Sequence, residues 1–219
     1  MYQIRKRKLM DLLLVIGLAI NIAAGQSDQM LSHSADTKKG SEKRVIVVFE
    51  TSLGKFEVAV NVERAPITAA NFLKYVNEGS YNNGIFHRTV RPDTESRTDY
   101  PIQVVQASSA KGSKQYPAIV LERTRVTGIR HIAGTVSMAR STADTAISDF
   151  FICIADAPEL DFGGKRNADG QGFAAFGYVV SGMEVVKKIQ AAPTKLNANG
   201  KPGQTLSPSV QIVKAYQKK

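Results

Sequence analysis

The sequence predicts a mainly β protein, a closed antiparallel β-barrel whose ends are plugged by two helices. Three observations favour this fold class. Apolar residues come mostly in short runs separated by turns, only two segments have helical spacing, and no internal repeat or second change in composition divides the chain. Many short strands are typical of barrels and sandwiches, and closure removes the exposed sheet edges that promote association. We therefore expect one domain and a monomer.

The first predicted element is a β-hairpin. Residues 45–49 form a β-branched apolar run, residues 51–54 supply a turn, and apolar side chains recur at every second position from Phe56 to Val60. Alternation with period two places one face of the second strand against a core.

Two segments have the spacing of amphipathic helices. The first is predicted to begin at Pro66, because a proline at the first helical position lacks an N–H that the helix does not need there, and Gly79 suits the position just after its end. Its apolar face consists of Ala69, Phe72, Leu73 and Val76. The second is predicted to begin at Ser181, since Ser181 and Glu184 have capping-box spacing. Its apolar face consists of Val185, Val186 and Ile189.

Six further apolar runs are predicted to be strands or parts of strands. They are residues 102–105, 119–121, 135–138, 150–154, 173–180 and 210–213. The single cysteine, Cys153, falls in one of these runs, so it is interpreted as a buried strand residue without a disulfide partner in the chain.

The N-terminal segment has the pattern of a secretory signal peptide. Four basic residues at positions 5–8 precede an apolar run at 12–20 and small residues at 23–25. That run is short for a bilayer core of about 30 Å, so residues 1–25 are interpreted as a removable signal rather than an uncleaved anchor. Residues 26–43 are polar and without period, which predicts a flexible linker before a folded domain at 44–219. We expect a periplasmic or secreted protein with no stable membrane insertion after signal removal.

Charge and ligand-type residues exclude some functions. The formal net charge is +10, of which the N-terminal segment contributes +3. The remaining basic residues are scattered and not interleaved with aromatic residues, so a solvated basic surface is favoured over a nucleic-acid site. His33 and His131 lie far apart without metal-ligand spacing. We therefore expect no metal and no cofactor.

Five sequence blocks occur in one order along the chain. They are Ala65-Pro66 with Asn71-Phe72, the stretch Tyr-Asn-Asn-Gly-Ile-Phe-His-Arg at 81–88, Gly-Thr-Val-Ser-Met-Ala at 134–139, Ser-Asp-Phe-Phe-Ile at 148–152, and the junction at 176–185. Together these blocks resemble the cyclophilin family over about residues 45–213. The resemblance implies an eight-stranded antiparallel β-barrel capped by two α-helices, and Arg140 is similar to bacterial secreted members.

The resemblance also implies an activity, peptidyl-prolyl cis–trans isomerisation that assists folding of secreted or periplasmic proteins. Its partners would be Xaa-Pro-containing polypeptides. The barrier to peptide-bond rotation is about 18–20 kcal/mol, so a catalyst needs an apolar slot for the prolyl ring and a donor aimed at the amide nitrogen as the bond twists. The family motif implies that Arg88 is this catalytic donor; the alternative is a structural ion pair. The substrate-binding residues it implies are Gln106, Phe151, Leu160, Phe173, Val104, Gln103, His87, Arg140 and Asp149, with His87 open to a purely structural role.

The sequence departs from the family pattern around the expected pocket. Extra stretches occur at residues 91–101 and 162–172, and Gln103 falls where the family has a pocket phenylalanine, unless Tyr100 or Ile102 replaces that ring. Asp149 stands where the family has glutamine, and its carboxylate can either orient Arg88 or withhold it. These changes keep a second function open, a catalytically weakened cyclophilin-fold module that binds proline-containing or unfolded segments.

Overall fold

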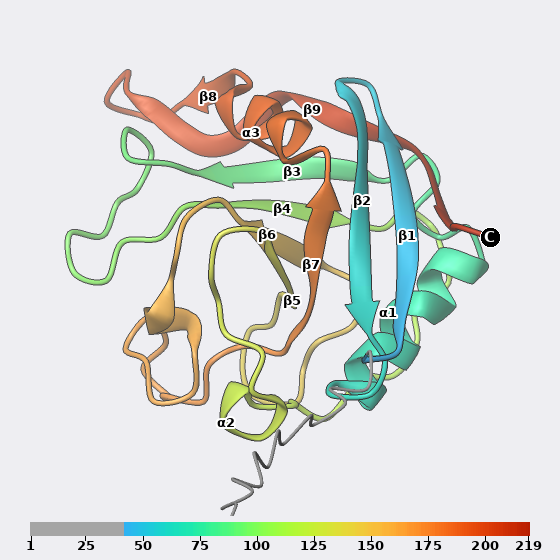
Figure 1. The fold of residues 1–219 in the computed structure, drawn as a ribbon. Coiled ribbons are helices and arrows are strands. Elements are labelled where there is room, and N and C mark those ends of the chain that lie inside the picture. The colour runs from blue at the N-terminus through green and yellow to red at the C-terminus, as the bar shows by residue number, and fades with distance from the viewer. Residues whose placement is uncertain (1–41) are drawn as a thin grey trace, which may run out of the picture. The chain divides into compact units, whose positions relative to one another are not determined.

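Eight strands close into an antiparallel barrel in the part of the chain that the structure describes, residues 42–219 of a computed structural model (Figure 1). Around the barrel the order is β1-β2-β7-β5-β6-β4-β3-β9, and β9 pairs with β1 to complete the ring. The predicted eight-stranded barrel is therefore confirmed. The predicted signal peptide, and the predicted linker up to residue 41, lie outside the described residues.

The eight barrel strands lie between Arg44 and Gln217. They are β1 (Arg44–Thr51), β2 (Gly54–Asn61), β3 (Ile85–Val90), β4 (Val104–Ser108), β5 (Thr135–Met138), β6 (Phe150–Cys153), β7 (Ala175–Ser181) and β9 (Pro202–Gln217). A ninth strand, β8 (Thr194–Leu196), pairs only with β9 and lies outside the ring. The helices are α1 (Pro66–Asn77), the short α2 (Thr124–Thr127) and α3 (Met183–Ala191), with a 3₁₀ helix at Pro158–Leu160.

Helices α1 and α3 close the two ends of the barrel, because their apolar faces belong to the same buried cluster as the inward-facing strand residues. α1 begins at Pro66 as predicted, and Gly79 follows its end with a positive φ of 69°. The free N–H groups of its first turn are bound by a distant side chain. The Glu122 carboxylate accepts hydrogen bonds from the backbone of Ile67 at 3.1 Å and of Thr68 at 2.7 Å.

Two sequence predictions are wrong in detail. Residues 119–121 form only an isolated bridge between Ile119 and Ala146. In addition, strand β3 was not predicted, because His87 and Arg88 interrupt its apolar run. The second helix does not begin at a capping box. Ser181 is the last residue of β7, and α3 starts at Met183 after Gly182, which has a φ of 79° and no side-chain cap.

Alternation along β4 and β6 gives the sheet two apolar faces. Val105, Ala107, Phe150 and Ile152 point into the barrel core, whereas Val104, Phe151 and Cys153 belong to a second cluster outside it. A strand turns successive side chains to opposite faces, so both clusters follow from one backbone. Residues of the second cluster form the apolar part of the candidate site.

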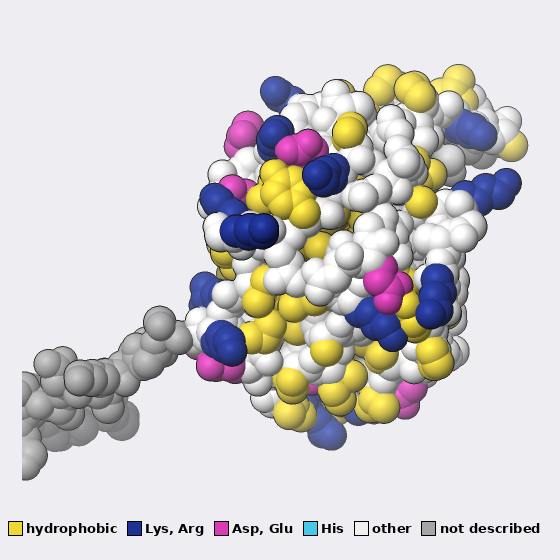
Figure 2. Space-filling view, turned by 90° about the vertical axis from the view of Figure 1, so that its right-hand side faces the viewer, with side chains coloured by type: hydrophobic (Ala, Val, Ile, Leu, Met, Phe, Trp, Pro, Cys, Tyr) yellow, Lys and Arg dark blue, Asp and Glu magenta, His cyan; other side chains and the backbone are white. Residues whose placement is uncertain are grey.

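The long loops at 91–103 and 161–174 extend on the same side of the barrel, at the left in Figure 1. Figure 2 shows the side of the domain that lies at the right in Figure 1, where Lys and Arg side chains are interspersed with acidic and apolar ones. Within residues 42–219, no helix has the length and apolar character needed to cross a bilayer.

Candidate active site

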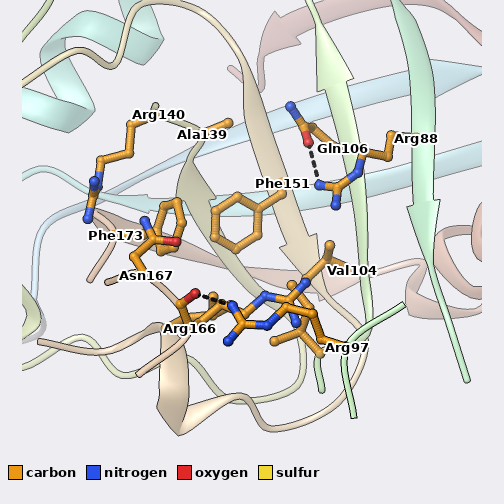
Figure 3. Close-up of a pocket in the computed structure, with 12 residues that line it drawn as sticks. Arg88, Arg97, Val104, Gln106, Ala139, Arg140, Phe151, Arg166, Asn167 and Phe173 are labelled. Carbon is orange, nitrogen blue, oxygen red and sulfur yellow. Dashed lines mark hydrogen bonds between the residues drawn. The ribbon is translucent and has the colours of Figure 1, made fainter. Parts of the chain in front are cut away.

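A cavity of about 310 Å³ lies on the outer face of β4 and β6, beneath the two long loops (Figure 3). Its apolar lining comes from strand, 3₁₀-helix and loop residues and consists of Ile102, Val104, Ala139, Phe151, Leu160 and Phe173. The rings of Phe151 and Phe173 meet edge to face with centroids 5.4 Å apart. Such a hollow can hold a small apolar ring.

The aromatic floor is held from behind by a buried polar chain. The His131 ring stacks on Phe151 with centroids 6.0 Å apart. Its Nδ1 lies 2.8 Å from Oδ1 of Asp161, and its Nε2 lies 3.0 Å from Oγ of Ser137. All three polar residues are buried. Because both imidazole nitrogens have partners, the ring is fixed and supports Phe151 in one orientation.

A β-bulge directs Arg88 into this cavity. In the β3–β4 ladder Phe86 pairs with Ala107 and Arg88 pairs with the very next residue, Gln106, so His87 is the extra residue. Without the bulge, Phe86 and Arg88 would share a face because they are two positions apart. With it, Phe86 stays in the barrel core while Arg88 and Gln106 line the cavity.

Two glutamines, rather than a carboxylate, hold the Arg88 guanidinium. Nη1 donates to Oε1 of Gln106 at 3.1 Å, and Nε and Nη2 donate to Oε1 of Gln204 at 3.0 and 2.7 Å. A guanidinium has five N–H groups, so one on Nη1 and one on Nη2 have no acceptor among the described residues. Burial lowers the pKa of Arg88, and the charge of Arg166 adds to this effect while Glu95 opposes it.

Seven of the ten predicted site residues line this one cavity. They are Arg88, Val104, Gln106, Arg140, Phe151, Leu160 and Phe173. Gln103 does not, which corrects the expected position. Its side chain accepts a 3.3 Å hydrogen bond from Gln190 on α3, because it precedes the outward-facing Val104 by one residue. Ile102 lines the cavity in its place, one of the two replacements considered from the sequence.

Asp149 lies in a neighbouring groove of about 410 Å³ that shares Gln106, Ala139 and Arg140 with the cavity. Among the described residues no carboxylate forms an ion pair with Arg88, so the pairing considered from the sequence is not found. Burial raises the pKa of Asp149, while the charge of His87 and the Gln106 amide act in the opposite direction.

His87 lines neither the cavity nor the groove. Its Nδ1 is buried without a hydrogen-bond partner among the described residues. Burial lowers the pKa of His87, and the Asp149 and Arg88 charges act in opposite directions on it. A neutral ring in the bulge follows, which agrees with the structural role left open for this residue.

Four polar residues of the site were not predicted. Gln204 comes from β9, and Arg97, Arg166 and Asn167 come from the two inserted loops. No local pattern marks them, since Arg97, Arg166 and Asn167 reach the cavity, and Gln204 reaches Arg88, only through tertiary structure. Residues 42–219 also contain no cluster of three or more side chains able to ligate a metal.

Comparison with known proteins identifies the class. Residues 46–216 match the model of the family "Cyclophilin type peptidyl-prolyl cis-trans isomerase/CLD". The chain belongs to this family, and it is therefore a peptidyl-prolyl cis–trans isomerase of the cyclophilin type.

Bacterial relatives agree with this assignment. The chain is 40% identical over 154 residues to peptidyl-prolyl cis-trans isomerase A of Dickeya dadantii, covering 68% of this chain and 73% of the relative. It is 34% identical over 150 residues to isomerase B of Escherichia coli, covering 68% and 86%. A crystal structure of a Cryptosporidium parvum cyclophilin matches the fold with a TM-score of 0.62 at 19% identity, covering 81% of this chain and 99% of that one.

Proposed function

We propose that this isomerase acts on Xaa-Pro bonds of polypeptides outside the cytoplasm, with Arg88 as the catalytic donor. The observation that carries the proposal is the position of the Arg88 guanidinium beside an apolar floor, held by two neutral glutamines. A guanidinium paired with a carboxylate would be largely neutralised. Here its charge and two of its N–H groups remain available.

The proposed chemistry needs no covalent step. The prolyl ring enters the hollow over Phe151, Leu160 and Phe173, which fixes one side of the imide bond. As the bond twists, the nitrogen lone pair is no longer delocalised into the carbonyl and becomes a hydrogen-bond acceptor. Arg88 then donates to it, and this interaction exists only in the twisted state, so it lowers the barrier.

Gln106 has a supporting part in this proposal. Its Oε1 accepts from Arg88, and its strand position faces the cavity between Arg88 and Phe151 on the paired strands. It is suited to hold Arg88 while its amide contacts the substrate backbone. Val104 and Ile102 complete the apolar wall on the same side.

The proposed location rests on the N-terminal signal pattern at residues 1–25 and on the similarity to bacterial isomerases. Substrates there are newly exported chains, whose Xaa-Pro bonds exchange slowly, in tens of seconds or more. A solved structural relative is described in the presence of the dipeptide Ala-Pro, which fits the proposed substrate class.

The test is cis–trans exchange of an Ala-Pro peptide measured by NMR, for the wild type and for Arg88→Ala. We expect faster exchange with the wild type and a reduction of about 10²–10³ in the variant, the usual effect of losing one transition-state donor. Binding without faster exchange would instead favour the module that only binds proline-containing segments. Exchange within twofold of the wild type in Arg88→Ala would remove Arg88 from its role.

A further inference from the structure

The two inserted loops bring additional positive charge to the cavity. Besides Arg88 and Arg140, its lining includes Arg97 from the first loop and Arg166 from the second, and it includes no Asp or Glu. Figure 3 shows these four side chains distributed around Phe151, with Arg97 and Arg166 on the side of Val104.

The carboxylates that pair with the loop arginines are absent from the cavity lining. Glu95 binds Arg166 at 2.9 Å, and Asp99 binds Arg97 at 2.8 Å, but neither acid lines the cavity. The same holds for Asp169, which binds Arg140 at 2.7 Å. Each pair is therefore oriented with its cationic end toward the cavity.

The loops are fixed in this arrangement. The Arg166–Glu95 pair joins the two loops and is almost fully buried, with the side chains 10% and 4% exposed. Arg166 also donates to the backbone oxygen of Tyr100 at 3.1 Å, and Arg97 donates to the backbone oxygen of Arg166 at 2.6 Å. The positive groups are held in place and do not need to be ordered by a ligand.

The unpaired Arg88 carries the net positive charge of the cavity, and the three ion pairs add dipoles whose guanidinium ends line it. A concave site lined by one sign of charge concentrates field lines and attracts the opposite charge. The neighbouring groove differs, because there Asp149 stands beside Arg140. A negative side chain of a bound polypeptide is therefore stabilised on the side of the inserted loops.

We infer that the inserted loops make this enzyme prefer Xaa-Pro segments that carry an acidic side chain next to the proline, with Arg97 as a specificity-determining residue. The inference rests on the proposed function, since it concerns the same cavity. Arg97 is the most accessible of the loop arginines, with 36% of its side chain exposed, so its charge is the one a flanking residue can approach.

Three matched peptides test the inference, Ala-X-Pro-Phe with X as Glu, Gln or Lys, together with the series Ala-Ala-Pro-X. Exchange rate and dissociation constant are both measured by NMR. We expect kcat/KM to be on the order of fivefold higher for Glu than for Lys in at least one series, with Gln between them. The ratio should approach one as ionic strength rises from about 10 mM to about 1 M, because the Debye length falls from about 30 Å to about 3 Å.

Two substitutions should shift the ratio in opposite directions. Arg97→Gln removes the positive charge and should lower the Glu-to-Lys ratio at least twofold, whereas Asp99→Asn removes the balancing acid and should raise it. Lys187→Gln is the matched control, since Lys187 is an exposed residue of α3 away from the cavity lining and should leave the ratio unchanged.

The outcomes separate the inference from the proposed function. Exchange that is accelerated equally for Glu and Lys peptides, or a ratio unaffected by Arg97→Gln, overturns the acidic preference and leaves the isomerase proposal standing. Tighter binding of Glu peptides without accelerated exchange supports the preference and overturns the proposed catalytic role. Neither binding nor exchange with any of the peptides overturns both.

Discussion

Gln204 accepts hydrogen bonds from two nitrogens of Arg88, from Nε at 3.0 Å and from Nη2 at 2.7 Å. The two residues are 116 positions apart in the sequence and meet because β9 lies beside β3. The Gln204 amide nitrogen in turn donates to the backbone oxygen of Thr94 at 3.1 Å, at the start of the first inserted loop. The guanidinium is thereby fixed from the side opposite Gln106, and the first loop is tied to the same support.

Gln204 is expected to act as a positioning residue. Gln204→Ala frees two Arg88 nitrogens and lets the guanidinium rotate, so kcat should fall about tenfold while KM changes little. Gln204→Glu keeps the acceptor but adds a charge that neutralises Arg88, so it should lower kcat as well. Steady-state kinetics on an Ala-Pro peptide measures both effects, and a change confined to KM would contradict this role.

A double-mutant cycle distinguishes positioning from a general loss of structure. If Gln204 acts through Arg88, then Gln204→Ala should have almost no effect on the residual activity of Arg88→Ala. Independent, multiplicative losses in the two variants would instead show that Gln204 acts by another route. Circular dichroism and unfolding midpoints of all four proteins provide the structural control.

Catalysis should not depend on pH between about pH 7 and about pH 9. The pKa of His87 is lowered by burial from its usual value near 6.5, so this ring is already neutral at pH 7. Arginine does not deprotonate in this range even with the lowered pKa of Arg88. A plot of kcat/KM against pH checks the expectation. A sigmoidal loss with a midpoint between these limits would indicate a titrating catalytic group.

The Glu95–Arg166 pair is expected to control local order of the inserted loops. Glu95 also accepts from the backbone N–H groups of Arg97 and Ile102, at 3.1 and 3.2 Å. Glu95→Gln leaves Arg166 charged and nearly buried without its partner, which should open both loops. We expect amide hydrogen exchange at least tenfold faster in residues 95–102 and 162–172, with strand β6 unchanged.

Glu63→Gln serves as the control for that experiment, because Glu63 is exposed and forms no ion pair or side-chain hydrogen bond within the described residues. Equal exchange rates in Glu95→Gln and Glu63→Gln would mean that the two loops are held mainly by other contacts.

Asp161 should make stability depend on pH in the acidic range. Burial alone would raise the pKa of this carboxyl, but hydrogen bonds from the His131 side chain and backbone, its charge, and Arg130 lower it overall. A lowered folded-state pKa stabilises the fold above the unfolded value near 3.9, and this stabilisation is lost as pH falls through the folded value.

Urea unfolding of the wild type and Asp161→Asn measures this contribution. The variant should be about 2 kcal/mol less stable at pH 7, because hydrogen bonds to a charged group contribute about 1.5–3 kcal/mol. The difference should begin to shrink below about pH 4, where the carboxyl of the unfolded wild type takes up a proton, and it should be lost once the pH falls below the lowered folded-state pKa. A difference that stays constant down to about pH 2 would contradict the lowered pKa of Asp161.

Much of the architecture could be predicted from local patterns, and the exceptions have identifiable causes. The hairpin β1–β2 and the start of α1 at Pro66 follow from alternation and from proline geometry. Strand β3 was missed because its outward-facing positions carry functional polar residues, which break the apolar run. The start of α3 was misplaced because β7 continues through Ser181, which pairs with Glu57 of β2. Ser181 is therefore a strand residue and does not cap the helix.

Most residues of the candidate site could also be predicted from the sequence. The resemblance to the family predicted Arg88, Gln106, Phe151, Leu160 and Phe173 as site residues, and all five line one cavity. The expected position of the Gln103 side chain was wrong, because side-chain direction in a strand depends on register. An inserted loop of eleven residues precedes this strand, so its register could not be predicted from the sequence. Ile102 replaces it only because Gln103 turns toward α3.

Short-range periodicity and blocks of neighbouring residues are enough to predict the class of barrel, the family and the residue types of the Phe-His-Arg motif. The direction of Arg88 into the cavity follows from the bulge at His87, and its support comes from Gln204, so both depend on contacts between distant segments. The charge of the cavity also depends on such contacts, since Arg97 and Arg166 are 69 positions apart in the sequence. Direction and electrostatics depend on distances in space, which spacing along a chain does not encode.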